Sequence, residues 1–209
     1  MQRFIHSFSY IFHPLFVPVY VTLLYFMVAG IYFSNTELYL IFIQVLILTV
    51  LLPVSLFYLL RSLGLIKSII TLTLKERRLP LAFYALLLFM LIKHSFSTFA
   101  VTELYFYFLG LFISTLLALS LVLSGYKTSL HMLAVTSLTM FVISLSAYFH
   151  IRFIYGIAFF ILCCGFVASS RLQAKEHTPA ELLAGTLTGI LPQVAVWYLW
   201  PAVSAFYNI

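Results

Sequence analysis

The stretch LYLIFIQVLILTVLLPVSLFYLL, residues 38–60, contains no charged side chain. A helix of about 20 predominantly apolar residues is long enough to cross the hydrocarbon core of a bilayer, so this stretch can span a membrane. Further apolar runs bounded by polar residues lie at 14–33, 79–98, 103–123, 131–149, 151–169 and 180–206. The sequence therefore predicts an all-α fold, a polytopic integral membrane helical bundle with about six or seven transmembrane helices.

The composition of the whole chain agrees with this class of protein. Of the 209 residues, 64% are hydrophobic and only 8% are charged, against about 25% charged residues in an average soluble domain. The apolar runs leave no room for a sizeable soluble domain, and we expect residues 1–209 to form a single membrane domain. No small-residue cleavage site follows the first run, which we interpret as a retained first helix.

Prolines and glycines inside the apolar runs predict how the helices bend and pack. Pro53 and Pro192 lie within runs, where a missing N–H group favours a kink. Gly185 and Gly189 are four residues apart in the last run and form a small-xxx-small face. We expect this face to let a neighbouring helix approach closely.

Lys and Arg residues are distributed unequally over the two ends of the predicted helices. If the runs cross the membrane in order, one side carries the N-terminus and the segments 61–78, 124–130 and 170–179. Nine of the eleven Lys and Arg residues then lie on that side, and two, Lys93 and Arg152, lie on the other. Because positive charge marks the cytoplasmic side of membrane proteins, the sequence predicts that the first side faces the cytoplasm.

Most of the reactive side chains lie in three segments on that first side. They read KERRLP at 75–80, KTSLH at 127–131 and SRLQAKEHTPAE at 170–181. Ionisable groups close to the hydrocarbon are costly and tend to have a function, so their convergence favours an anion-binding site. The alternative is that they are juxtamembrane charges attracted to anionic lipid headgroups.

The third segment resembles a signature of the type 2 phosphatidic acid phosphatase superfamily. It has Ser170-Arg171, five residues, His177, three residues and Glu181, where the family usually has Asp last. The second segment has Ser129-Leu130-His131 where the family has Pro-Ser-Gly-His, and two apolar runs separate it from Arg171, as in the family. The first family signature is a Lys, six residues and Arg-Pro, whereas here Thr71 precedes Arg78 by seven residues and Leu79 separates it from Pro80. The resemblance, concentrated in residues 124–181, is that of a divergent member.

The resemblance implies roles for these side chains. His177 would attack phosphorus and carry a phosphohistidine, Glu181 would orient the His177 ring, and His131 would protonate the leaving group. Polar and cationic side chains would bind the phosphate group: Arg171, Ser129, Arg78 and Lys75. The scheme uses no metal ion and no cofactor. It implies a lipid-phosphate phosphatase or phosphotransferase in the bilayer of a bacterial inner membrane. The excess of Lys and Arg, and not the resemblance, predicts that the site is on the cytoplasmic face.

Several of these residues also fit structural roles. Thr178, Pro179 and Glu181 form a good helix start, with Thr178 as N-cap and Glu181 closing a capping box. Ser129 or Thr128 fits the N-cap of the following helix. His131 fits an interfacial position, and Lys127 fits a headgroup contact better than a catalytic role. The other histidines match no spacing that indicates a site: His6, His13, His94 and His150.

Two other functional classes remain open from the sequence. A phosphatase-like protein without turnover, which binds lipid or serves as a subunit of a membrane complex, is favoured by the incomplete first signature, by Leu130 and by Glu181. A transporter or channel is less favoured because the ionisable residues lie at helix ends and not deep within the helices. We expect no nucleic-acid binding, since no basic surface exists away from the membrane. The sequence selects neither one lipid phosphate nor an oligomeric state.

Overall fold

The computed structural model describes residues 2–29, 33–66, 73–94 and 101–206, and within them all regular secondary structure is helical. Two helices precede the first long span: α1 (Gln2–Ile11) and α2 (Val17–Ala29). The next rod consists of α3 (Asn35–Leu46), the π-helical turn η2 (Ile47–Leu51) and α4 (Leu52–Ser62). Five further helices complete the described chain: α5 (Leu74–His94), α6 (Thr102–Leu123), α7 (Leu130–Tyr148), α8 (Ile154–Gln173) and α9 (Pro179–Phe206).

The predicted membrane bundle is confirmed. Within the described ranges, five helical stretches are long and apolar enough to cross a membrane: Asn35–Ser62, Thr102–Leu123, Leu130–Tyr148, Ile154–Gln173 and Pro179–Leu199. α5 includes residues 79–94 of the predicted run at 79–98, whose last four residues lie outside the described ones, and it carries charged side chains at both ends. Large apolar side chains such as Tyr155, Leu162 and Leu199 face outward, as expected where lipid is the surrounding solvent.

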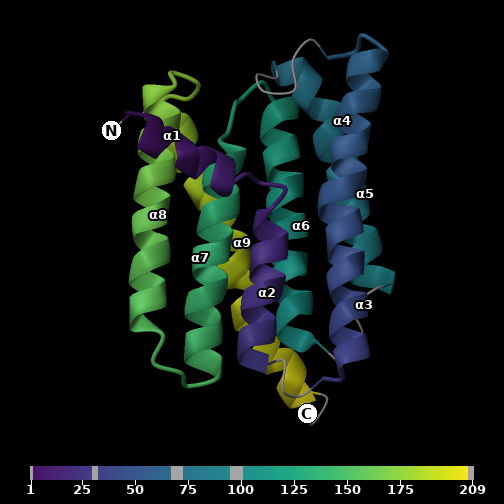
Figure 1. Ribbon diagram of the computed structural model, residues 1–209, viewed down its shortest axis with the longest axis vertical. Helices are drawn as coiled ribbons and strands as arrows, with labels where there is room; N and C mark the ends of the chain where they lie inside the picture. Colours follow the sequence, from purple (N-terminus) through teal and green to yellow (C-terminus); the bar gives the residue numbers. More distant parts are fainter. Residues whose placement is uncertain (1, 30–32, 67–72, 95–100, 207–209) are drawn as a thin grey trace.

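The helices alternate in direction, as Figure 1 shows. α4, α6 and α8 end at the same end of the bundle at which α5, α7 and α9 begin, and the N-terminus lies at that end too. The three reactive segments are therefore all located there. Residues 67–72 of the first connection, with Lys67 and Thr71 near its two ends, are outside the described residues.

The start of the chain differs from the prediction of a first helix over 14–33, because α2 begins at Val17 and the additional helix α1 precedes it. A turn at residues 12–16 separates α1 from α2, and α1 lies obliquely across α8 (Figure 1). The Phe8 and Phe166 rings stack with centroids 4.7 Å apart, and the Ser9 hydroxyl donates to Ser170 Oγ at 2.6 Å. α1 is therefore fixed against α8, which carries Arg171 in its last turn, and the turn after α1 is brought over the reactive segments.

Pro53 is associated with the irregularity that the sequence predicts. Its ring removes the N–H group that would bond to the Thr49 carbonyl in an α-helix. The chain forms the π-helical turn η2 over these residues, and the Thr49 hydroxyl donates to the Val45 carbonyl at 2.8 Å. A π-helical turn is a common way of accommodating such a break inside a long helix. α9, by contrast, continues as a helix through Pro192.

Gly185 and Gly189 allow α9 to approach α7 closely, as the sequence predicts. A Cβ atom at Gly185 would lie 2.4 Å from the Ser129 carbonyl oxygen. A Cβ atom at Gly189 would lie 2.2 Å from Thr136 Oγ1 and 2.5 Å from the Leu133 carbonyl oxygen. These distances are below van der Waals contact, so only glycine fits. The close approach also brings the start of α9 against the start of α7.

We expect Gly189→Ala to destabilise the bundle, since the clash with the α7 backbone must force the two helices apart. Overpacking of this kind lowers the free energy of unfolding by about 1–3 kcal/mol. Gly165→Ala on α8 is the matched control, because a Cβ atom there would meet nothing within 4 Å. Thermal unfolding in detergent should show a lower midpoint for Gly189→Ala only. Equal midpoints for the two variants would contradict the close packing of α7 and α9.

Candidate active site

Direct hydrogen bonds join the three reactive segments. Arg77 Nη1 donates to the Thr128 carbonyl oxygen at 3.2 Å, which links the start of α5 to the start of α7. The backbone N–H of Ser129 donates to the Glu181 carbonyl oxygen at 3.2 Å, and Lys127 Nζ donates to the Glu176 carbonyl oxygen. The segments 75–80, 127–131 and 170–181 thus form one cluster, as the sequence analysis expects.

His177 and Glu181 are in direct contact. His177 Nδ1 lies 2.8 Å from Glu181 Oε2, and the histidine is only 7% exposed. The Glu181 carboxylate also accepts from the Thr178 N–H at 3.2 Å, while Thr178 Oγ1 accepts from the Glu181 N–H at 3.3 Å. The capping box and the histidine contact therefore coexist. The first turn of α9, whose N–H groups favour anions, begins beside the histidine.

The surroundings of His177 favour its neutral form. Burial, together with the positive charges of Lys127, Arg77 and Arg171, lowers the pKa of His177 to about 4, against the opposing effect of the Glu181 hydrogen bond. The ring is therefore neutral near pH 7. Because Glu181 is a carboxylate acceptor, the proton belongs on Nδ1, which leaves the Nε2 lone pair free to act as a nucleophile.

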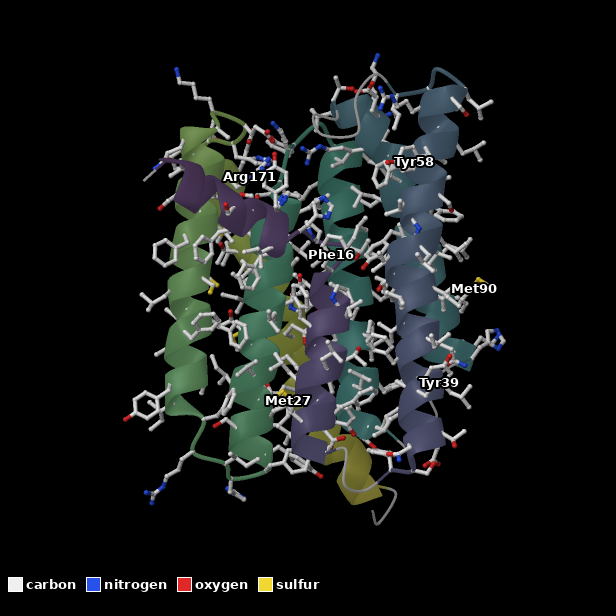
Figure 2. The ribbon with its side chains drawn as sticks, viewed as in Figure 1. Phe16, Met27, Tyr39, Tyr58, Met90 and Arg171 are labelled. Atoms are coloured by element: carbon white, nitrogen blue, oxygen red, sulfur yellow. The ribbon has the colours of Figure 1, made fainter. Side chains whose placement is uncertain are left out.

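Arg171 is the buried cation of the cluster. It is 7% exposed and forms an ion pair with the Glu176 carboxylate through Nη2. Arg171 Nε and the buried Thr128 hydroxyl have no hydrogen-bond partner among the described residues. Buried polar atoms are nearly always paired in proteins, so these two atoms are available to a ligand. Figure 2 shows Arg171 at the end of the bundle where α1 lies.

The first segment contributes Arg77 to the cluster. Arg77 is half-buried and lies within electrostatic range of Arg171, Glu176 and Glu181. Arg78 and Lys75, which the resemblance assigns to phosphate binding, are exposed. In the structure Arg77, and not Arg78, lies toward the cluster. The rotation of α5 about its axis determines which of the two arginines reaches the cluster.

Ser129 has the capping role that the sequence left open. Its side chain is fully buried and accepts from the Met132 N–H at 3.4 Å, as N-cap of α7. It also lies against Gly185, where an added Cβ would be 3.1 Å from Ser129 Cβ. The contact of this hydroxyl with phosphate, which the resemblance implies, stays a prediction. The neighbouring Thr128 hydroxyl offers the free polar atom instead.

His131 and His13 form a pair of histidine rings in the cluster. Their ring centroids are 5.3 Å apart with an interplanar angle of 88°, and His131 lies within electrostatic range of Arg171, His177 and Arg77. The Leu15 N–H donates to His13 Nδ1 at 3.4 Å, which places the ring proton of neutral His13 on Nε2. Burial and the charge of Arg171 lower the pKa of His13.

Two of these groups, His13 and Glu176, were missed by the sequence analysis. His13 lies in the turn between α1 and α2, far from any motif, and only the packing of α1 on α8 brings it to His131. Glu176 is one of the five unspecified residues between Arg171 and His177. Its place five residues after Arg171 was the available signal, since buried arginines are usually paired.

The cluster suits an oxyanion better than a metal ion. Three cationic side chains, Lys127, Arg77 and Arg171, lie within electrostatic range of His177, and two carboxylates compensate part of this charge. Among the described residues, no group of three or more His, Cys, Asp or Glu side chains is placed to hold a metal. An arginine fork and a helix start are typical phosphate ligands.

Comparison of the chain with protein-family models, with curated proteins and with solved structures finds no match in any of the three. The functional interpretation therefore depends on the geometry of the cluster and on the spacing of its residues.

Proposed function

We propose that the protein is an integral membrane lipid-phosphate phosphatase or phosphotransferase that uses a phosphohistidine intermediate. The observation that carries the proposal is the pair of His177 and Glu181, with Nδ1 and Oε2 2.8 Å apart, beside the buried Arg171. A neutral histidine held in one tautomer by a carboxylate is an activated nucleophile. The neighbouring guanidinium groups are suited to stabilise the charge on a transferring phosphoryl group.

In the proposed reaction, His177 Nε2 attacks phosphorus and the bond from phosphorus to the leaving lipid oxygen breaks. His131, which takes up a proton when the anionic substrate binds, gives this proton to the leaving oxygen. A water molecule, or the hydroxyl of an acceptor in a phosphotransferase, then attacks phosphorus, the bond from phosphorus to His177 Nε2 breaks, and His131 takes the proton of this nucleophile. His177 thereby returns to its neutral form. Arg171 and Arg77 bind the phosphate oxygens throughout. Because Glu176 pairs with Arg171, the phosphate must compete with this carboxylate for the guanidinium group.

The location of the cluster supports a lipid substrate. The cluster lies where spanning helices end, so a headgroup at the bilayer surface can reach it while its apolar tail stays in the membrane. The resemblance suggests phosphatidate, phosphatidylglycerol phosphate, polyprenyl diphosphate or lipid A phosphate. No metal ion takes part in the proposed mechanism, because the cationic side chains supply the electrostatic stabilisation.

The adjacent arginines Arg77 and Arg78 provide a direct test of this assignment. We expect purified wild-type protein to release phosphate from a panel of lipid phosphates. We expect Arg77→Met to lower kcat/KM by about 100-fold, as for removal of one donor to the transition-state oxygens. Arg78→Met is the matched control, since Arg78 is exposed, and should remain close to wild type. Equal loss in both variants, or loss only in Arg78→Met, would contradict the site described above.

We further propose that the cluster faces the cytoplasm of a bacterial inner membrane, on the basis of the excess of Lys and Arg at this end. In a variant without Cys163 and Cys164, we expect Lys175→Cys to react with an impermeant thiol reagent only after cell lysis. Arg152→Cys, at the opposite end, should react in intact cells. Both residues are exposed. The reverse pattern would place the site on the outer face.

A second candidate is a lipid-binding protein without turnover. The pairing of Arg171 with Glu176 and the burial of Ser129 favour it, since both remove groups that the resemblance assigns to phosphate. This candidate predicts saturable binding of lipid phosphates without phosphate release. Release of phosphate from any member of the panel, lost on mutation of Arg77, would exclude it.

A further inference from the structure

An apolar groove begins beside the cationic cluster. It has an empty volume of about 690 Å³, including the part open to the outside, and lies between α4, α5, α6 and α7. Apolar side chains line most of it, among them Leu56, Leu81, Leu111 and Leu133. A groove of this kind at membrane depth is suited to a hydrocarbon chain.

Arg77 connects the groove to the cluster. It lines the groove and also donates to the Thr128 carbonyl oxygen in the cluster. Pro14 and Leu130, which neighbour His13 and His131 in the chain, line the same end. The groove thus has a cationic end beside the histidines and an apolar length that runs away from them, which matches the polarity of a lipid phosphate.

One polar atom farther along the groove is unpaired. The Tyr84 hydroxyl oxygen is buried and has no hydrogen-bond partner among the described residues, and Tyr84 lines the groove. Tyr84 follows Arg77 by seven residues on α5, so the two share a helix face about 10 Å apart along the axis. The other groove hydroxyl, that of Thr115, donates to the Leu111 carbonyl at 2.8 Å.

We propose that this groove holds an ester-linked acyl chain of a glycerolipid phosphate, and that the Tyr84 hydroxyl donates a hydrogen bond to the ester carbonyl. The inference rests on the proposed function and specifies its substrate class. A buried hydroxyl without a partner is unfavourable, and an ester carbonyl just below the phosphate supplies the missing acceptor. An ether-linked or isoprenoid chain offers no carbonyl and leaves the hydroxyl unpaired. Tyr84 is therefore a specificity-determining residue that selects ester-linked lipids.

The test compares diacylglycerol phosphate with its dialkyl ether analogue, which lacks only the carbonyl groups, in mixed micelles. We expect wild type to prefer the ester by about tenfold in kcat/KM, the effect of one buried hydrogen bond. Tyr84→Phe, which keeps the ring, should reduce this ratio to about one. Tyr58→Phe on α4 is the matched control, because Tyr58 is 63% exposed; its ratio should equal that of wild type.

A second measurement examines the groove without requiring turnover. A diacylglycerol phosphate with a photoactivatable diazirine in its acyl chain should label peptides of α5 and α6 in wild-type protein, and excess unlabelled lipid should prevent the labelling. An unchanged ester preference in Tyr84→Phe, a preference of wild type for a polyprenyl phosphate, or labelling confined to outward-facing residues would overturn the inference. If wild type releases no phosphate from any lipid but labels the groove, the proposed turnover fails while the groove assignment stands.

Discussion

His177→Ala is expected to reduce lipid-phosphate turnover by at least about a thousandfold, the size of effect that follows removal of a catalytic nucleophile. No other side chain of the 170–181 segment can replace the attacking nitrogen. The Nε2 atom of neutral His177 is the group that forms the bond to phosphorus, and the residue is too buried to act as a general surface charge. The measurement is phosphate release from a lipid-phosphate panel by purified, folded variants.

Glu181→Gln separates catalysis from helix capping. Gln keeps the shape of the side chain and can close the capping box with Thr178, but it loses the charge that stabilises the imidazolium and fixes the tautomer. We expect residual activity in the order wild type, Glu181→Gln, His177→Ala. If Glu181 acts only in capping, Glu181→Gln will be almost silent and His177→Ala will matter little. That ranking would contradict the assigned roles.

Arg171→Lys is expected to lower kcat/KM by about 100-fold although the positive charge is kept. The lysine can still pair with Glu176, so the fold should tolerate the change. It cannot present the two parallel N–H groups of a guanidinium to phosphate oxygens, and it lacks the Nε donor, which has no hydrogen-bond partner among the described residues. Steady-state kinetics on the same lipid phosphates measure the loss.

Two further variants identify the cause of that loss. Lys175→Arg is the control, since Lys175 is exposed just beyond the end of α8, and its kinetics should match those of wild type. Glu176→Gln removes the carboxylate that competes with phosphate for Arg171, and its KM should fall. Wild-type kinetics for Arg171→Lys would show that Arg171 serves only the ion pair with Glu176.

The fold was predictable from the sequence because the length of each apolar run and the polar residues between runs determine a membrane helix. The close approach at Gly185 and Gly189 was predictable for a similar reason, since small residues four apart share a helix face. The separation of α1 from α2 was not predictable from the sequence. Pro14 is as compatible with the first turn of a helix as with the turn that the structure contains, and the packing of Ser9 on Ser170 decides between them.

The candidate site was predictable where its contacts are local. His177 and Glu181 are four residues apart at a helix start, and this spacing brings their side chains together. Arg77 and Arg78 could not be distinguished, because the choice depends on the rotation of α5, which no local pattern determines. His13 reaches His131 only through the docking of α1 on α8, a contact between segments far apart in the chain.

The central claim is that His177 carries a phosphoryl group during turnover, and rapid-quench trapping tests it most directly. Wild-type protein mixed with a phosphorus-labelled lipid phosphate, and quenched under alkaline conditions within the first turnover, should contain an acid-labile phosphoryl group. Peptide mapping should locate this group on His177, and it should be absent from His177→Ala. Phosphate release by wild type with no trapped phosphoprotein under conditions where the intermediate accumulates, or a label on any other residue, would contradict the account.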